Sequence, residues 1–266
     1  MGKLTGQIRK ACIESHLFNQ TGIYMKLSSL LIAVLAASSG AAFAQATQQD
    51  GAWRGNLAYS LALAKGNTQS TNSVLAADTS RATEADKITL YASNLSARAN
   101  SIKTGNATTF GGRYDRNLSP SLFVFGAADF EKDSIKQLKL RTTLGSGVGL
   151  HVVNNANTTF DVYGGLAWMN SKYNTGLESK SGVGLILGEE STHKLSADTS
   201  FKQKLVLYPT SGNTRAVFEA GFQTALAANM NLQVSLINKY NSKVPAGIKK
   251  SDMLFFTGVN MAFGPK

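Results

Sequence analysis

Apolar residues alternate with polar or small residues along most of the chain from about residue 50 onward. In residues 53–65, one face carries Trp53, Leu57, Tyr59, Leu61 and Leu63, and the other carries Arg54, Asn56 and small residues. Residues 138–152 repeat this pattern. A repeat of two is typical of half-exposed β-strands, because successive side chains of a strand point to opposite faces. The sequence therefore predicts an all-β protein.

Similar segments follow one another at regular spacing. The further predicted strands are residues 73–81, 87–98, 107–116, 122–131, 158–170, 181–189, 193–207, 214–226, 231–241 and 252–263. With the two segments above they make about twelve strands. The alternation is thin in residues 73–81 and 181–189, so ten or fourteen strands are the alternatives.

The lengths of the connections separate a membrane barrel from a soluble sandwich, which alternation alone cannot do. Short turns are predicted at residues 82–86, 117–121, 154–157, 190–192 and 227–230. Mostly longer, polar loops are predicted at residues 66–72, 99–106, 132–137, 171–180, 208–213 and 242–251. Outer-membrane barrels have short periplasmic turns and longer external loops. The order predicts a single transmembrane, antiparallel, up-and-down β-barrel with both ends in the periplasm.

The N-terminal region resembles an export signal. Lys26 precedes a short apolar run at residues 30–37, and Ala42-Phe43-Ala44 forms an A-x-A cleavage site. The apolar run is shorter than the roughly 20 residues that span a bilayer. We expect a signal peptide at residues 25–44 and a mature barrel at residues 45–266. Residues 1–24 are interpreted as an over-extended start, with an unusually long charged region as the alternative.

The C-terminal strand has the form of a barrel-assembly signal, with Gly258 ahead of Met261 and Phe263. Barrel-assembly machinery is therefore an expected partner, although three residues follow Phe263. An ordinary last strand is the alternative. The only cysteine, Cys12, lies ahead of the predicted mature chain, so no disulfide is expected there.

The formal net charge of +11 raises the question of nucleic acid. However, the basic residues are spread singly along strands, and no nucleic-acid-binding motif is visible. Outer-membrane lipids and lipopolysaccharide, whose headgroups are anionic, are the expected partners of this charge.

Charged residues occur on the polar face of several predicted strands. By parity the candidates for the barrel lumen are Asp129, Glu131, Lys139, Arg141, Asp161, Asp198, Lys202, Arg215 and Glu219. Opposite charges on neighbouring strands can pair across the wall. Either they form an electrostatic constriction that selects small ions or solutes, or they satisfy one another and partly fill the barrel.

No catalytic set stands out. His151 and His193 both fall beside predicted periplasmic turns, and neither has a serine and an acid at suggestive spacing. Two histidines and scattered acids give no metal-ligand spacing, and no cofactor is expected. Gly145, Gly147 and Gly149 lie within a strand, where glycine permits bending or close approach.

Several elements resemble the domain-of-unknown-function family 481, the YdiY-like salt-induced outer-membrane proteins. They are residues 66–71, residues 133–149, Tyr208-Pro209, and Tyr240, Pro245, Gly247, Lys249, Lys250 and Asp252 ahead of the last strand. The resemblance covers nearly all of residues 53–263, with Ile135 where an aromatic residue is expected. It implies an outer-membrane barrel linked to osmotic conditions, and it supplies no substrate, ligand or functional residue.

These observations favour a non-enzymatic outer-membrane barrel that acts as a narrow passive pore or an envelope structural protein. An enzyme acting on lipid or peptide at the outer leaflet is one alternative, and it would use acid and base groups of the external rim. Asp133, Lys172, Glu178 and Asp252 are available there. A soluble periplasmic binding barrel is the other alternative.

Overall fold

The computed structural model describes residues 48–64, 70–174, 179–211, 213–243 and 250–265. They form twelve strands: β1 (Trp53–Ala64), β2 (Ser70–Ala82), β3 (Asp86–Ala99), β4 (Ile102–Asn117), β5 (Leu122–Asp133), β6 (Leu138–Asn154), β7 (Thr158–Tyr173), β8 (Lys180–Lys194), β9 (Thr199–Pro209), β10 (Thr214–Ala227), β11 (Met230–Asn241) and β12 (Ser251–Phe263). The predicted signal peptide, with Ala42 and Ala44 at its end, lies outside the described residues.

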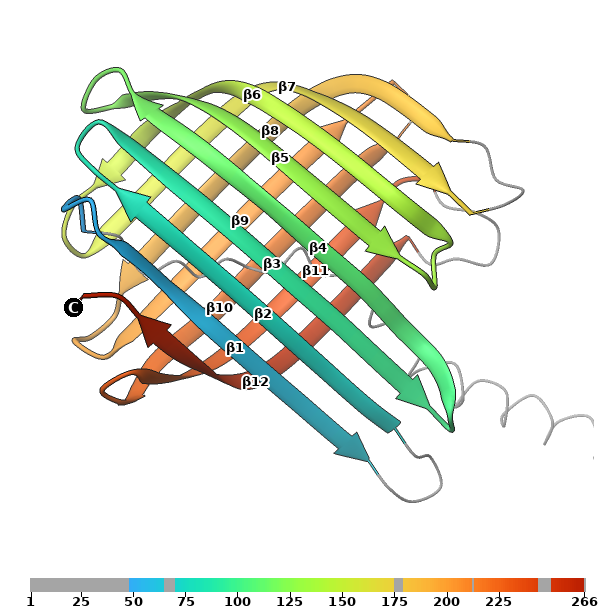
Figure 1. Ribbon diagram of the computed structural model, residues 1–266. Coiled ribbons are helices and arrows are strands. Elements are labelled where there is room, and N and C mark those ends of the chain that lie inside the picture. The colour runs from blue at the N-terminus through green and yellow to red at the C-terminus, as the bar shows by residue number, and fades with distance from the viewer. Residues whose placement is uncertain (1–47, 65–69, 175–178, 212, 244–249, 266) are drawn as a thin grey trace, which may run out of the picture. The chain divides into compact units, whose positions relative to one another are not determined.

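The strands form one closed barrel. Each strand pairs antiparallel with its neighbours in sequence, and β1 pairs with β12 to close the ring. Figure 1 shows β1 in blue beside β12 in dark red at this seam. Every strand of the ring therefore has a paired neighbour on each side. The predicted all-β, up-and-down, twelve-stranded barrel is therefore confirmed.

Apolar side chains cover the outside of the barrel, and polar side chains line much of its inside. Leu57, Val148 and Phe255 are 46%, 55% and 66% exposed, whereas Asn56, Glu131 and Ser235 are buried. This is the reverse of a soluble protein, and it is the arrangement of a barrel surrounded by hydrocarbon. In the described part of the chain, no helix is long and apolar enough to cross a membrane.

One end of the barrel carries short turns at residues 83–85, 118–121, 155–157, 195–198 and 228–229. The C-terminus lies at this end (Figure 1), which we call the turn end. The opposite end, which we call the loop end, carries connections at residues 65–69, 100–101, 134–137, 174–179, 210–213 and 242–250. The sequence predicted this division, but two connections differ from it.

The first difference lies between β8 and β9. The predicted turn at residues 190–192 is wrong, because β8 continues to Lys194 and the chain turns at residues 195–198. The Ser196 hydroxyl accepts hydrogen bonds from the backbone N–H groups of Asp198 and Thr199, at 3.3 and 3.1 Å. A serine side chain that bonds to its own backbone in this way favours a turn.

The second difference lies between β3 and β4. A longer loop was predicted at residues 99–106, but the connection is only Asn100-Ser101. Both residues have positive φ angles, 48° and 66°. Positive φ at both central residues is the geometry of the two-residue hairpin turn that matches the twist of paired strands, and Asn tolerates it.

The seam between β1 and β12 is short. Their paired register runs only from Gly55 opposite Phe263 to Tyr59 opposite Val259, whereas β1 pairs with β2 along its whole length. At the turn end, Arg54 donates hydrogen bonds to Asp50 and to the backbone oxygen of Pro265. It therefore joins the segment before β1 to the segment after β12.

The residues of the predicted assembly signal lie in β12. Met261 and Phe263 are 58% and 49% exposed on the outside of the barrel, and Gly258 approaches Tyr59 of β1. Their recognition by assembly machinery stays a prediction.

Candidate functional site

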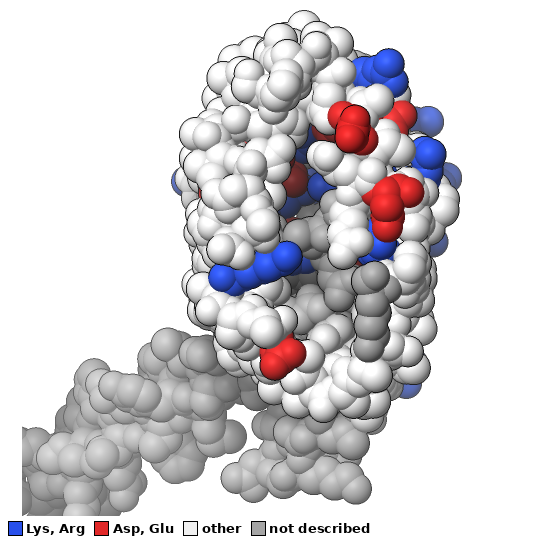
Figure 2. All heavy atoms as spheres, turned by 90° about the vertical axis from the view of Figure 1, so that its left-hand side faces the viewer, with Lys and Arg blue, Asp and Glu red and all other residues white. Residues whose placement is uncertain are grey.

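The barrel encloses a cavity of about 180 Å³. Side chains from β3 to β10 line it, and its charged members are Lys87, Arg113, Asp115, Asp129, Glu131, Arg141, Glu190, Lys202, Lys204, Arg215 and Glu219. Figure 2 looks onto the turn end, where charged side chains of both signs line a central hollow. The candidate site is therefore the lumen, and its chemistry is ionic.

One group of charges meets at Glu131 of β5, and we call it the Glu131 cluster: Glu131, Arg141, Arg215 and Lys239. The Glu131 Oε2 atom lies 3.1 Å from Nη1 of Arg141 and 3.4 Å from Nη2 of Arg215. Its Oε1 atom lies 4.0 Å from Nζ of Lys239.

The four strands that supply these residues form two neighbouring pairs on opposite sides of the ring. Arg141 comes from β6, the neighbour of β5, but Arg215 comes from β10 and Lys239 from β11. In a ring of twelve strands, β5 and β11 are six strands apart in either direction. The Glu131 cluster therefore crosses the lumen from one wall to the opposite wall.

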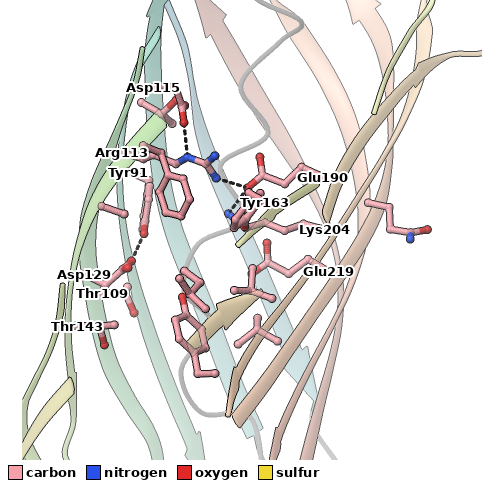
Figure 3. A pocket seen from close by; sticks show the side chains of 18 of the residues that line it. Tyr91, Thr109, Arg113, Asp115, Asp129, Thr143, Tyr163, Glu190, Lys204 and Glu219 are labelled. Carbon is pink, nitrogen blue, oxygen red and sulfur yellow. Dashed lines mark hydrogen bonds and ion pairs between the residues drawn. The ribbon is translucent and has the colours of Figure 1, made fainter. Parts of the chain in front are cut away.

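A second group, the Glu190 cluster, contains Arg113, Asp115, Tyr163, Glu190 and Lys204. Arg113 of β4 donates to Asp115 at 2.7 Å and to Oε1 of Glu190, on β8, at 3.2 Å. The same Oε1 atom accepts from Nζ of Lys204 at 3.1 Å and from the Tyr163 hydroxyl at 3.2 Å. In Figure 3, Arg113 and Glu190 point toward each other from facing walls.

Aromatic rings hold the Arg113 guanidinium in place. Its Cζ atom lies 4.2, 4.6 and 5.6 Å from the ring centroids of Tyr163, Phe125 and Phe123, within the range of cation–π attraction. The three rings belong to a buried apolar cluster with Ala167, Ile186 and Val206. Arg113 is therefore fixed by both charge and packing.

Glycines make room for the rings that point into the lumen. Cross-strand partners pair Phe123 with Gly149, Phe125 with Gly147, Tyr163 with Gly188 and Tyr91 with Gly111. A Cβ atom on Gly149 would lie 2.1 Å from the Phe123 ring, and one on Gly147 would lie 2.2 Å from the Gly164 carbonyl oxygen. Close approach, one of the two roles predicted for the glycines of β6, is thus confirmed for Gly147 and Gly149, whereas a Cβ atom on Gly145 would meet its nearest neighbour at an ordinary 3.6 Å.

Six of the nine predicted lumen residues line the cavity: Asp129, Glu131, Arg141, Lys202, Arg215 and Glu219. Asp129 also accepts a hydrogen bond from the Tyr91 hydroxyl. Asp161 lies near the turn end, where its Oδ1 atom is hydrogen-bonded to Nδ1 of His151 at 2.7 Å.

The predicted lumen positions of Lys139 and Asp198 are wrong. A β-bulge between Leu138 and Leu140 leaves Lys139 without a cross-strand partner, so that Leu138 is buried and Lys139 is exposed. Counting alternate residues fails across such an irregularity. Asp198 lies in the turn after β8 and is exposed.

The sequence missed five central residues: Arg113, Tyr163, Glu190, Lys204 and Lys239. Glu190 fell in the wrongly predicted turn. Lys239 carried a usable signal, because it lies on the same alternating face of β11 as Gln233 and Ser235, with Ile237 between them.

Among the described residues, one side-chain hydroxyl contacts a histidine: that of Thr158, beside His193. His151 bonds to Asp161 at 2.7 Å and to Asn117 at 3.2 Å, and His193 lies 3.3 Å from the hydroxyl of Thr158. Within the described ranges, neither ring is hydrogen-bonded to a serine.

Of the acid and base groups suggested for the external rim, the structure describes the side chains of Asp133 and Lys172. Asp133 is buried and accepts hydrogen bonds from the N–H groups of Ile135 and Lys136, so it holds the turn between β5 and β6. Lys172 is exposed, and Glu178 and the side chain of Asp252 lie outside the description. Among the described residues, no group of three His, Cys, Asp or Glu could hold a metal ion.

Comparison with solved structures finds porins and an autotransporter domain at low sequence identity. The NanC porin is 14% identical with a TM-score of 0.45, over 79% of this chain and 98% of that chain. The translocator domain of the autotransporter NalP from Neisseria meningitidis is 12% identical with a TM-score of 0.44, over 97% and 99%. An anion-selective porin from Comamonas acidovorans is 10% identical with a TM-score of 0.40, over 79% and 98%. These likenesses are too distant to add to what the chain's own geometry shows.

The search of curated proteins finds no match to this chain. A family model does match it, over residues 57–263, which include nearly all of the barrel from β1 to β12 and both ion-pair clusters. The family is described as proteins of unknown function. With the barrel and its charged lumen now described, the match shows that the chain belongs to the DUF481 family.

Proposed function

We propose that this protein is a non-enzymatic outer-membrane barrel that acts as a narrow passive pore for small ions and solutes. The observation that carries the proposal is a lumen lined by paired charges around a cavity, where an apolar filling could have closed it. Charged side chains that pair with one another but still line a cavity suit a water-filled passage. An ion that crosses it can replace part of its hydration shell with contacts to these side chains.

The apolar outer surface supports the location. Exposed Leu57, Val148 and Phe255 suit contact with lipid tails, and lipid and lipopolysaccharide headgroups would meet the charged residues of the two rims. The predicted signal peptide and the C-terminal assembly signal agree with export to the outer membrane. Fractionation of cells by detergent extraction tests this location, and release by salt or alkali alone would favour a soluble barrel.

The size of the cavity sets the class of solute. A volume of about 180 Å³ is well above the roughly 10–15 Å³ that one water needs, but long side chains of both clusters line the cavity and limit its width. We therefore expect water, inorganic ions and small organic ions to pass, and larger solutes to be excluded.

Single-channel recording tests the pore. Residues 45–266 would be refolded in detergent, checked by a heat-dependent gel shift, and inserted into a planar bilayer under a salt gradient. We expect small, discrete conductance steps. Arg215→Ala should enlarge them, because Arg215 bridges from β10 to Glu131 across the lumen. Lys139→Ala is the matched control, since Lys139 is exposed at the bulge and should leave the steps unchanged.

An envelope structural role is the second candidate. The favouring observation is that Glu131 forms ion pairs with Arg215 and Lys239 of the facing wall, which would stiffen the barrel. If the wild type and Arg215→Ala both fold and stay silent, the pore is excluded and the structural role remains.

The link to osmotic conditions rests on the family resemblance alone. It predicts that the amount of the protein in the envelope rises when cells grow in high salt. Equal amounts in high-salt and low-salt cultures, compared by quantitative immunoblot, would contradict it.

A further inference from the structure

We infer that the Glu131 cluster is a binding site for a small oxyanion, such as phosphate or a carboxylate, held between Arg141, Arg215 and Lys239 inside the lumen. The inference goes beyond the pore, because a site of this kind can be occupied whether or not the barrel conducts.

The charges that directly contact one another in the cluster do not balance. Three cationic side chains converge on one carboxylate, and two of them share a single oxygen atom, Oε2 of Glu131. The side chains are 18%, 12% and 5% exposed for Arg141, Arg215 and Lys239, so water compensates them only in part. Arg141 also donates to the Ser171 hydroxyl at 3.0 Å, and Arg215 lies 5.7 Å from the centroid of the Tyr208 ring, but neither of these partners is an anion. An added anion would therefore offset part of the excess positive charge.

Lys239 gives the second, independent observation. Its Nζ atom is buried and has no hydrogen-bond partner among the described residues. The nearest acceptor of opposite charge, Oε1 of Glu131, lies 4.0 Å away, which is beyond hydrogen-bond distance. An ammonium group has three donors. The Lys239 ammonium group thus reaches from β11 toward Glu131 and still lacks a hydrogen-bond acceptor.

The donors define the class of ligand. A guanidinium presents a planar fork that matches the oxygens of carboxylate and phosphate, whereas an ammonium acts as a point charge. Arg141 and Arg215 already hold a carboxylate oxygen between them, which shows that both forks reach one place. An oxyanion beside that place would add Lys239 as the third partner.

The site can be reached from the cavity. Glu131, Arg141 and Arg215 all belong to its lining. The volume of about 180 Å³ is several times the roughly 30 Å³ that one water occupies in the liquid. Glu131 sets the affinity, because its negative charge competes with the ligand for the same cations.

Calorimetric titration of the detergent-folded barrel with sodium phosphate, at constant ionic strength kept with sodium chloride, tests the inference. We expect saturable binding to the wild type. Lys239→Gln should weaken it about tenfold or more, as the loss of one charge-assisted hydrogen bond implies. Glu131→Gln should strengthen it, because the competing carboxylate becomes a neutral amide. Lys139→Gln is the control of equal charge change and should bind as the wild type does.

Two outcomes would overturn the inference. One is the absence of saturable heat in both the wild type and Glu131→Gln, each shown to be folded by the gel shift. The other is equal weakening by Lys239→Gln and Lys139→Gln, which would reduce the effect to general screening. Conductance measurements separate this test from that of the pore. A folded barrel that binds phosphate but does not conduct would refute the proposed pore and support the oxyanion site.

Discussion

Glu131 and Lys239 face each other from opposite walls of the barrel, with 4.0 Å between Oε1 and Nζ. The residues belong to β5 and β11, which lie six strands apart around the ring. Side chains of opposite strands therefore meet across the lumen. A passage narrowed in this way should respond to single substitutions, and the following predictions use that property.

If the barrel conducts as proposed, neutralising Arg141 should change its ion preference. Arg141 lines the cavity and contacts Glu131 at 3.1 Å. Its loss leaves the lumen more negative, so Arg141→Gln should shift the reversal potential toward cation preference in a salt gradient. Lys139→Gln removes the same charge at an exposed position and should leave the potential unchanged. Equal reversal potentials for all three proteins would refute the role of Arg141.

Gly147→Ala should destabilise the barrel. A Cβ atom at this position would lie 2.2 Å from the backbone oxygen of Gly164, which only a shift of β6 or β7 can relieve. We expect a loss of about 1–3 kcal/mol in the free energy of unfolding, as for other overpacked sites. Urea titration of the barrel in lipid vesicles measures it. Gly126→Ala is the control, because an added Cβ there meets nothing within 4 Å. A smaller loss for Gly147→Ala than for Gly126→Ala would contradict the packing argument.

Arg113 and Glu190 should show coupled effects on stability. They contact at 3.2 Å across the lumen, and Arg113 also lies against three aromatic rings. In a double-mutant cycle with Arg113→Gln and Glu190→Gln, we expect a coupling energy of about 0.5–3 kcal/mol. Arg113→Gln should also lower stability when Glu190 is already neutral, because the contacts with the rings are lost. Strictly additive losses would show that the pair contributes nothing as a pair.

The pH response of the segment before β1 should depend on Arg54. Hydrogen bonds from the Arg54 side chain, together with one from the N–H of Ala52, hold the pKa of the Asp50 carboxyl well below its usual range. A lowered pKa means that the contact stabilises the folded chain above about pH 4, the ordinary aspartate pKa, and that this contribution is lost as the pH falls further.

Carbon-13 NMR titration of the Asp50 carboxyl checks this prediction. In the wild type the resonance should move only at a pH well below the ordinary range. In the Arg54→Gln variant the midpoint of the titration should return to the ordinary aspartate pKa of about 3.9. A wild-type titration near that ordinary value would show that Arg54 does not hold Asp50 in solution.

The number of strands and the sidedness of the barrel could be predicted from the sequence because both are local. A strand exposes alternate residues to opposite surroundings, so Leu57 and Asn56 reveal their faces without knowledge of any partner. The same argument placed Asp129, Glu131, Arg141, Lys202, Arg215 and Glu219 on the inner face. It failed for Lys139 and Asp198, where a bulge and a turn interrupt the count.

Which charges meet across the lumen was decided only by the tertiary structure. Glu131 and Lys239 are more than a hundred residues apart in the chain, and no local pattern relates them. Closure of the ring and the tilt of the strands set the position of each inward side chain along the barrel axis. Long side chains at the same position can then contact one another across the lumen. The sequence by itself therefore determined a charged barrel, whereas its closure determined the two ion-pair clusters and left Lys239 without a hydrogen-bond partner.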